Sequence, residues 1–264
     1  MKYMGSKNRI AKDICRVIEQ EISQSNCVLT WVEPFVGGGN MLMYVSNNCG
    51  KAASNNCGKA AIEYDRKIAS DINKYAIDAL ISIRDHVTEL PKNNLEFTEN
   101  DYKQLRSSCA YHHKGYAGFA FSYGGKWMGG WRRDKTGKRD YVNESYRNAL
   151  KQSPYLQNVE LSVGDYKQIE TPYPSVIYCD PPYFGTTKYS TGVSGFSRGS
   201  VSGFNHTEFF DWCRMKASEG HYVFVSEYEA PDDFKCLWSK EITSSLTANT
   251  GHKKGIEKLF SPHG

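Results

Sequence analysis

The residues Asp180 to Tyr183, an acid followed by two prolines and a tyrosine, could prepare an amino group for attack on an electrophile. An exocyclic amine on a base is a poor nucleophile, because its lone pair is delocalised into the ring. If the carboxylate of Asp180 and the carbonyl of Pro181 accept the two amine hydrogens, the lone pair is freed, and positioning does most of the catalysis. Tyr183 would stack on the base once that base has left a duplex. The candidate catalytic residues are therefore Asp180, Pro181, Pro182 and Tyr183; the alternative is a plain turn.

The position of this motif after an apolar run supports the chemical interpretation. The run 175–179 is typical of a buried strand, and a strand cannot continue through two prolines, which donate no ladder hydrogen bond. The motif therefore lies at the carboxyl edge of a strand, where open α/β sheets bind their ligands.

A glycine-rich loop stands at the end of an earlier apolar run. The segment 33–40 reads Glu-Pro-Phe-Val-Gly-Gly-Gly-Asn, and its glycines allow backbone amides to approach a ligand closely. A nicotinamide-binding fingerprint would require glycine at position 42, which is Leu42. The remaining alternative is a tight turn from strand to helix without a ligand.

Asp71 is a candidate for binding ribose hydroxyls, because it closes a second predicted strand. It lies 32 residues after Gly39, against about 20 in a dinucleotide fold. An eight-residue segment, 46–53, recurs unchanged at 54–61, and removing one copy reduces the separation to 24. The alternative is that Asp71 caps the next helix.

The segment 126–139 has the composition of a nucleic-acid contact. It holds six basic residues against one acid, together with two tryptophans. Basic residues contact phosphates, arginine can pair with guanine, and an aromatic ring can fill the gap left by a flipped base. We predict that Arg132 or Arg133 reads a guanine, that Trp127 or Trp131 packs against the opened step, and that Lys126 contributes charge. The alternative is a solvated basic hairpin.

Strands and helices alternate on both sides of this segment, which predicts a mostly parallel α/β sheet. Strands are expected at 28–35, 67–71, 159–163, 175–180 and 222–226, and helices at 73–86 and 206–217. We expect one catalytic domain formed by 1–87 and 151–264, interrupted by a helical recognition subdomain at 88–150. The duplication 46–61, and a shorter one over 193–204, are expected to be surface loops.

Composition excludes several classes of protein. The chain has 264 residues, 23% charged and 39% hydrophobic, with a net charge of +4 and no apolar run of membrane-spanning length. Its eight cysteines form no CxxC pair, and His112 and His113 lack spaced partners, so we expect no metal. We expect a soluble cytoplasmic protein, monomeric because no coiled-coil heptads occur.

Taken in order, the motifs resemble the Dam-type DNA adenine-N6 methyltransferases. The similarity spans nearly the whole chain and rests on the segments 2–7, 33–40, 70–73, 164–166 and 180–183. It extends to the late segments 223–226 and 253–259. The resemblance implies a seven-stranded methyltransferase sheet, S-adenosylmethionine as methyl donor, and a flipped adenine in double-stranded DNA as acceptor, at GATC or a related short site.

The resemblance also implies which residues bind the cofactor. Tyr3 and Lys7 would flank it, while its methionine part would contact Pro34, Phe35 and the glycines Gly37, Gly38 and Gly39. Its ribose and adenine would lie near Asp71, Ile72, Asp165 and Tyr166, and Asp180 would adjoin the methyl group. Tyr189 falls where the family often has a pocket-lining tyrosine.

Several alternatives to adenine-N6 methylation stay open at this point. Cytosine-N4 transfer uses the same exocyclic-amine chemistry, and RNA or protein-glutamine methylation is favoured less because the basic insert suits duplex DNA. A DNA-binding protein that has lost catalysis is a rival of another class. A nicotinamide oxidoreductase is disfavoured by Leu42.

Overall fold

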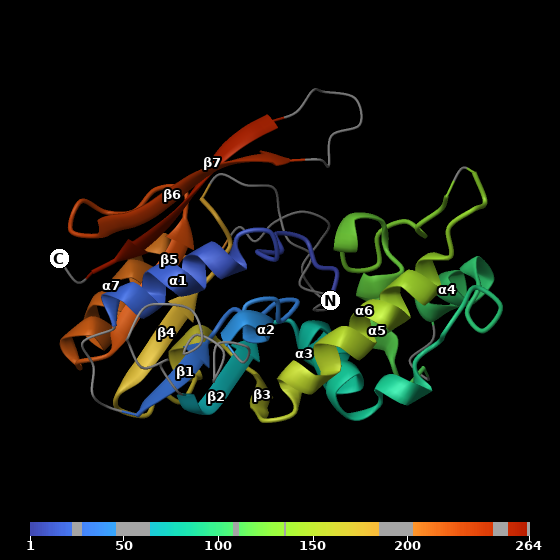
Figure 1. Ribbon diagram of the computed structural model, residues 1–264, viewed down its shortest axis with the longest axis horizontal. Helices are drawn as coiled ribbons and strands as arrows, with labels where there is room; N and C mark the ends of the chain where they lie inside the picture. The colour runs from blue at the N-terminus through green and yellow to red at the C-terminus, as the bar shows by residue number, and fades with distance from the viewer. Residues whose placement is uncertain are drawn as a thin grey trace, which may run out of the picture.

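The fold is built on one mostly parallel sheet, shown in Figure 1. The computed structural model describes residues 1–22, 28–45, 64–107, 111–134, 136–184, 203–244 and 253–262. Within these ranges the sheet has seven strands in the order β3-β2-β1-β4-β5-β7-β6. The duplication 46–61, most of the one at 193–204, and Tyr189 lie outside the described residues.

Five strands pair in parallel, and the last two pair antiparallel, so that only β7 runs in the opposite direction. The parallel strands are β1 (Leu29–Glu33), β2 (Tyr64–Asp71), β3 (Val159–Val163), β4 (Ser175–Cys179) and β5 (Tyr222–Glu227). β7 (Lys253–Ser261) pairs antiparallel with β5, and β6 (Lys235–Ser244) pairs antiparallel with β7. The predicted fold class, a seven-stranded mostly parallel sheet, is confirmed.

Two apolar cores cover the two faces of the sheet, as a central parallel sheet requires. Every residue of β1 and β4 is buried. Because side chains alternate along a strand, Trp31, Tyr178 and Phe224 join the core on one face. Their neighbours Val32, Ile177 and Val225 join the second core on the other face, with Phe209 and Cys213 of a helix.

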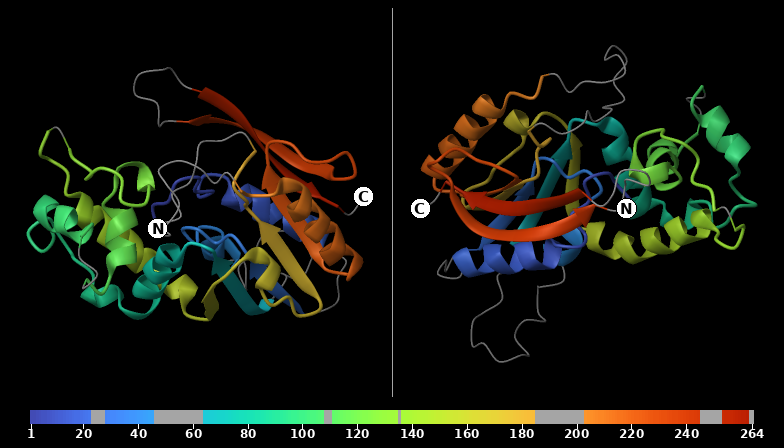
Figure 2. Two further views of the ribbon diagram at one scale, coloured as in Figure 1. Left: turned by 180° about the vertical axis from the view of Figure 1, so that it is seen from behind. Right: turned by 90° about the horizontal axis from the view of Figure 1, so that it is seen from above.

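Helices cover both faces. α1 (Ala11–Glu21) and α3 (Lys74–Asp85) supply residues to the first core, and α7 (His206–Ser218) supplies residues to the second. Figure 2 shows α1 and α7 on opposite sides of the sheet. α2 (Leu42–Val45) is a single turn after the glycine loop. No helix among the described residues has both the length and the apolarity needed to cross a membrane.

The segment between β2 and β3 forms a helical lobe beside the sheet (Figure 1). It contains η2 (Val87–Glu89), α4 (Glu99–Leu105), α5 (Lys114–Ala120), η3 (Tyr123–Gly125) and α6 (Tyr141–Leu156). α5 packs closely on α3 at Gly115, where an added Cβ would lie 2.4 Å from the carbonyl oxygen of Tyr75. α6 continues past position 150, so the expected boundary at 150 falls inside a helix.

Two features differ from what the sequence indicated. β6 is absent from the predicted strands, because polar and apolar residues alternate only weakly along its sequence. Its pairing with β7 places it in the sheet. The cap of α3 is Asn73, whose side chain accepts a hydrogen bond from the Tyr75 amide at 3.1 Å. Asp71 is therefore not the helix cap, although its Oδ1 accepts the amide of Asn73 at 2.8 Å.

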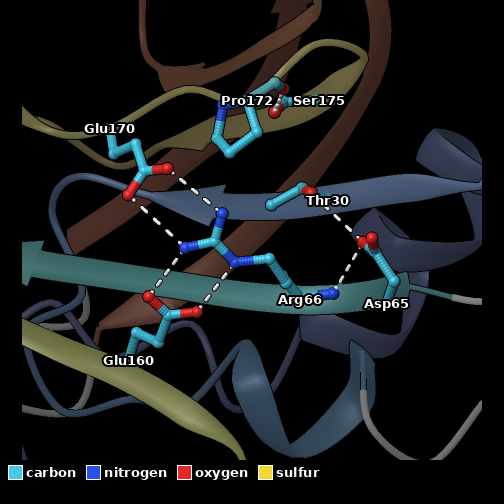
Figure 3. A network of polar contacts seen from close by, with 7 residues as sticks. All are labelled: Thr30, Asp65, Arg66, Glu160, Glu170, Pro172 and Ser175. Carbon is cyan, nitrogen blue, oxygen red and sulfur yellow. Dashed lines mark hydrogen bonds and ion pairs between the residues drawn. The ribbon is translucent and has the colours of Figure 1, made fainter.

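An ion-pair network ties three parts of the sheet together on the side away from the carboxyl edge (Figure 3). The Arg66 guanidinium of β2 donates to both oxygens of Glu160 on β3, each at 2.9 Å. The same group donates to Glu170, in the segment that leads to β4, at 3.1 and 3.4 Å. These bidentate pairs favour the register of the edge strand β3.

Replacing Arg66 with methionine is expected to lower the thermal unfolding midpoint in low salt, because both glutamates lose their partner. In roughly 1 M salt the Debye length falls to about 3 Å, and the difference from wild type should shrink. Thermal melts at two ionic strengths measure this effect. The matched control is Arg16→Met, at an exposed position of α1. A salt-independent loss confined to Arg66→Met would mean that packing, not charge, is responsible.

Candidate active site

A cavity of about 510 Å³ lies at the carboxyl ends of β1, β2 and β4, between the sheet and the helical lobe. The sheet contributes the loops that follow these strands, with Glu33, Asp71 and Asp180 among the lining residues. The lobe contributes Phe119 and the stretch from Gly125 to Gly129. Parallel strands place the motifs together because their carboxyl ends meet at one edge.

Most of the candidate residues line this cavity. Of those expected at the cofactor and the reacting amine, the lining includes Tyr3, Lys7, Pro34, Phe35, Gly37, Gly38, Asp71, Ile72, Asp165, Tyr166, Asp180, Pro181 and Pro182. Gly39 and Tyr183 are not among the lining residues. Of the candidates for DNA contact, Lys126 and Trp127 line the cavity, whereas Trp131, Arg132 and Arg133 do not.

The glycine loop is held by Asp71 and packed against Tyr3. The Asp71 Oδ2 accepts the amide of Gly37 at 2.9 Å, which fixes the loop after β1 to the end of β2. Gly37 has φ +48°, and an added Cβ would lie 2.8 Å from the Tyr3 ring. Gly39 faces away from the cavity, where a Cβ would lie 3.0 Å from Leu80. The loop thus needs glycine for its backbone and for close packing.

Asp180 is paired with a buried ammonium group. The Lys7 Nζ lies 2.9 Å from the Asp180 Oδ1 and 3.8 Å from the Glu257 Oε2. Lys7 also lies 4.5 Å from the centre of the Tyr183 ring. The Tyr183 hydroxyl donates to the Glu257 Oε2 at 2.7 Å. The ring of Tyr183 is thus buried between charged partners, and the turn after β4 is tied to the N-terminal segment and to β7.

Burial dominates the acid–base character of the site. Burial raises the pKa of Asp180 to about 6, although the Lys7 ammonium acts in the opposite direction. Burial likewise raises the pKa of Asp71 to about 6, against the two backbone amides that it accepts. The pKa of Glu33 is raised well above its usual range by burial, and that of Glu227 to about 7. The pKa of Lys7 is raised, because Asp180 and Glu257 outweigh its burial.

Aromatic rings form the side of the cavity that the helical lobe contributes. Trp127 stacks on Tyr75 with ring centres 4.0 Å apart, and Phe119 lies 5.1 Å from both Trp127 and Tyr3. The Met4 amide donates to the Gly125 carbonyl at 3.1 Å. The N-terminal segment and the lobe are therefore packed together around one ligand space.

The remaining DNA-contact candidates lie in the lobe with partners of their own. Trp131 packs among Phe97, Tyr102 and Phe121. The Arg132 side chain is 10% exposed, pairs with Glu144 at 2.7 Å and lies over the Tyr141 ring at 3.8 Å. In the structure, Trp131 therefore packs within the lobe, and Arg132 is ion-paired and covered by a ring. Their predicted contacts with DNA stay predictions.

Arg133 differs from Arg132 in exposure. Its side chain is 66% exposed, and its guanidinium makes an ion pair with Glu99 at the start of α4. An exposed arginine can exchange such a partner for a phosphate or a base at small cost. Of the two arginines, Arg133 is the one that is accessible from solvent.

Sequence reasoning missed several lining residues. Phe204, Asn205 and Glu208 line the cavity from the start of α7, and Phe204 packs on Phe35 with ring centres 5.9 Å apart. Glu33 and Asn40, at the two ends of the glycine motif, also line it. The sequence held a signal for Glu33, because this acid ends a predicted strand and ligands bind at the carboxyl ends of parallel strands. No signal in the sequence pointed to Phe119.

No group of three or more histidine, cysteine, aspartate or glutamate residues in the described ranges is arranged to hold a metal ion. The structure does bring His112 and His113 next to His86, with ring centres 5.3 and 5.8 Å from His86.

Residues 3–255 match the model of the D12 class N6 adenine-specific DNA methyltransferases. The Type II methyltransferase M.MjaIII of Methanocaldococcus jannaschii is 28% identical over 222 residues, which cover 74% of this chain and 72% of that protein. The family match spans the sheet, the lobe and the cavity.

Two solved structures resemble the chain only distantly. A crystal structure of SMU.472 complexed with SAH has a TM-score of 0.40 at 10% identity, and covers 98% of this chain. This chain spans about half of that protein, 53% of its length. The rRNA methyltransferase aviRa of Streptomyces viridochromogenes has a TM-score of 0.39 at 11% identity, covering 96% of this chain and 83% of its own.

Replacing Gly37 with alanine is expected to destabilise the fold by about 1 kcal/mol or more, because φ is positive there and the new methyl group meets Tyr3. Chemical denaturation measures the change. Gly130→Ala is the matched control, since no atom lies within 4 Å of an added Cβ. Equal stability of the two variants would contradict the tight packing of the glycine loop on Tyr3.

Proposed function

Because this chain belongs to the D12 class N6 adenine-specific DNA methyltransferases, we propose that its cavity binds S-adenosylmethionine beside a flipped adenine, whose amine is held by Asp180. The enzyme transfers a methyl group from S-adenosylmethionine to adenine N6 in DNA. The observation that carries the assignment of residues is the position of Asp180 and Pro181. Both line the cavity at the end of β4, the strand next to β1, whose following glycine loop lines the same cavity.

The donor set suits S-adenosylmethionine, which carries a ribose, an adenine and a positively charged sulfonium. A carboxylate has about four acceptor sites, and Asp71 uses two on the amides of Gly37 and Asn73, so capacity remains for ribose hydroxyls. Tyr166 and Phe35 stack with ring centres 5.5 Å apart and offer an apolar surface beside the adenine. Tyr3, Pro34 and Gly38 would hold the methionine part. When bound, the cofactor supplies an electrophilic methyl group.

Asp180 and Pro181 would prepare the amine. The Asp180 carboxylate accepts one amine hydrogen and the Pro181 carbonyl accepts the second, which draws the lone pair of N6 out of conjugation with the ring. Proline at 181 and 182 fixes the backbone that aims this carbonyl. The pairing of Asp180 with Lys7 at 2.9 Å keeps the carboxylate in place before substrate arrives.

Tyr183 already has partners that limit its expected stacking on a flipped base. Its ring already contacts the Lys7 ammonium, and its hydroxyl is bonded to Glu257. The residue is 7% exposed, contacts Tyr228 and does not line the cavity, so stacking on a flipped base would require a rearrangement that uncovers the ring. Trp127 offers further aromatic surface at the cavity wall.

The family match and the cavity disfavour the alternative functions that the sequence left open. The family is specific for adenine N6, which removes the ground for cytosine-N4 transfer. It also removes the ground for a nicotinamide enzyme. Loss of catalysis is disfavoured by the complete motif at 180–183 and by its place in the cavity wall.

Double-stranded DNA is the proposed form of the substrate, with the helical lobe as its recognition surface and GATC or a related short site as the target. The charge of the segment 126–139 supports this assignment. We further propose that the enzyme acts as a monomer in the cytoplasm of a bacterium or phage-infected cell.

Replacing Asp180 with alanine is expected to reduce methyl transfer on the order of 10²-fold or more, because one of the two acceptors of the amine is lost. Unmethylated duplex DNA is incubated with labelled S-adenosylmethionine, and N6-methyladenine is measured by nucleoside mass spectrometry. Asp211→Asn, an exposed acid on α7, is the control. Calorimetry should show that Asp180→Ala still binds the cofactor; unchanged N6-methyladenine would remove Asp180 from the reaction.

Alanine at Arg133 is expected to weaken DNA binding, whereas alanine at Arg132 is expected to lower stability, since Glu144 and Tyr141 lose one of their two arginine partners and keep only Arg139. If Arg133 reads a guanine, discrimination at one base pair falls by about 1–3 kcal/mol. If it contacts phosphate, the salt dependence of the binding constant weakens instead, with a slope changed by about 0.9. Anisotropy titrations on cognate and substituted duplexes at several salt concentrations decide between these roles.

A further inference from the structure

A buried ammonium group stands at the centre of the site. Lys7 is 6% exposed, and its Nζ lies near two carboxylates, those of Asp180 at 2.9 Å and Glu257 at 3.8 Å. It also donates a hydrogen bond to the Gly5 carbonyl at 3.3 Å and lies 4.5 Å from the centre of the Tyr183 ring. A charge this deeply buried persists only when such partners compensate for the lost water.

Glu257 is the partner that neither the motifs nor the expected cofactor contacts explain. It is 5% exposed and lies on β7, opposite Lys240 of β6. Side chains two residues apart share a face of a strand, so Glu257 lies on the same face as Leu259, which belongs to the core with Trp31 and Tyr178. An acid on an apolar face is costly unless its oxygens are paired.

The pairing of Glu257 connects it to the reacting end of β4. Its Oε2 accepts the Tyr183 hydroxyl at 2.7 Å and lies 3.8 Å from Lys7, which in turn pairs with Asp180. Both ends of the turn 180–183 are thus fixed, the first by Lys7 and the last by Glu257. The next amide, that of Phe184, donates to Glu227 at 2.8 Å.

We propose that Glu257 is a positioning residue for methyl transfer: it fixes the Tyr183 phenol and the Lys7 ammonium, and through them sets the orientation and charge of Asp180. This inference rests on the proposed role of Asp180. Glu257 does not line the cavity and would not touch the base or the cofactor. Its effect reaches the amine only through the two residues that it holds.

The protonation state of Asp180 determines how methyl transfer depends on pH. The carboxylate of Asp180 accepts an amine hydrogen, and the protonated acid accepts it less well, so transfer should fall as the pH drops through the pKa of about 6. The charge of Glu257 raises the pKa of Asp180, and that of Lys7 lowers it. Other ionisable groups that interact with Asp180 come from several elements: Glu33 of β1, Tyr178 and Cys179 of β4, Tyr183, and Glu227 and Tyr228 at the end of β5.

The test compares Glu257→Gln with wild type in single-turnover methyl transfer across pH 5 to 8.5, which covers both sides of the Asp180 transition at a pKa of about 6. Glutamine keeps an acceptor for the Tyr183 hydroxyl but removes the charge. The acid limb of the rate profile is expected to move to lower pH, because a like charge near Asp180 has gone. A Glu257→Gln enzyme that unfolds more easily but keeps the wild-type limb would overturn the proposal, since a merely structural role predicts that result.

The variant Tyr183→Phe tests whether Glu257 acts through the Tyr183 phenol. It removes the hydroxyl that Glu257 holds, and the rate is expected to fall roughly tenfold, the equivalent of one hydrogen bond. The acid limb is expected to move to higher pH, because the Tyr183 hydroxyl lowers the pKa of Asp180. Fluorescence of 2-aminopurine at the target position reports whether the base still leaves the duplex. If Glu257→Gln and Tyr183→Phe act additively in the double variant, the two side chains are not coupled and the proposal fails.

Two controls keep the outcomes distinct. Glu241→Gln removes an exposed acid from the same β6–β7 hairpin and should leave the limb in place. Asp180→Ala tests the premise: if it retains wild-type methyl transfer, the role of Asp180 fails and that of Glu257 with it. If Asp180→Ala loses transfer while Glu257→Gln keeps the wild-type limb, only the role of Glu257 fails.

Discussion

The ion pair between Lys7 and Asp180 is the interaction on which the site depends. It joins the segment before α1 to the end of β4, two parts of the chain that no strand pairing connects directly. A buried pair of this kind adds little to stability by itself, since the loss of hydration offsets the attraction. Its value is in specifying geometry, because an unpaired Lys7 or Asp180 at this depth would be strongly unfavourable. The carboxyl edge of the sheet is therefore organised around charge as much as around apolar packing, with Glu33, Asp71 and Glu227 also buried there.

Much of the sheet could be predicted because its central strands are buried on both faces and read as apolar runs. β3 was predicted at its observed bounds, and β4 and β5 within one residue. β2 extends three residues before the predicted Lys67, since its first residues are only partly buried. The hairpin of β6 and β7 was harder, because it has one partly solvated face and takes its register from β5. The closing segment of the chain was recognised through family resemblance, and the contribution of β6 to the sheet was not.

The candidate site divides along a similar line. Most predicted residues in short motifs after strands line the cavity, because the carboxyl ends of parallel strands meet at one edge of the sheet. Glu257 lies in the segment 253–259, which the family resemblance includes, but a single glutamate among several charged residues carries no local signal. Its contact with Tyr183 joins positions 74 residues apart in the chain. Composition does not show the environment of each basic residue in the segment 126–139. Arg132 is covered by Tyr141 and paired with Glu144. A count of charges does not show which of them are already paired.

The packing of Tyr3 and Met4 against the helical lobe has a thermodynamic consequence. Tyr3 contacts Phe119, Met4 bonds to Gly125, and the loop through Gly129 forms a wall of the same cavity as the glycine loop. Arg106 holds that loop through the carbonyls of Met128 and Gly129, at 2.7 and 2.6 Å. Any displacement of the loop by a duplex changes the shape that the small ligand meets. By linkage, whatever factor one ligand imposes on the affinity of the other is returned in equal measure. The coupling between the two binding equilibria is then a property of the wall that the ligands share.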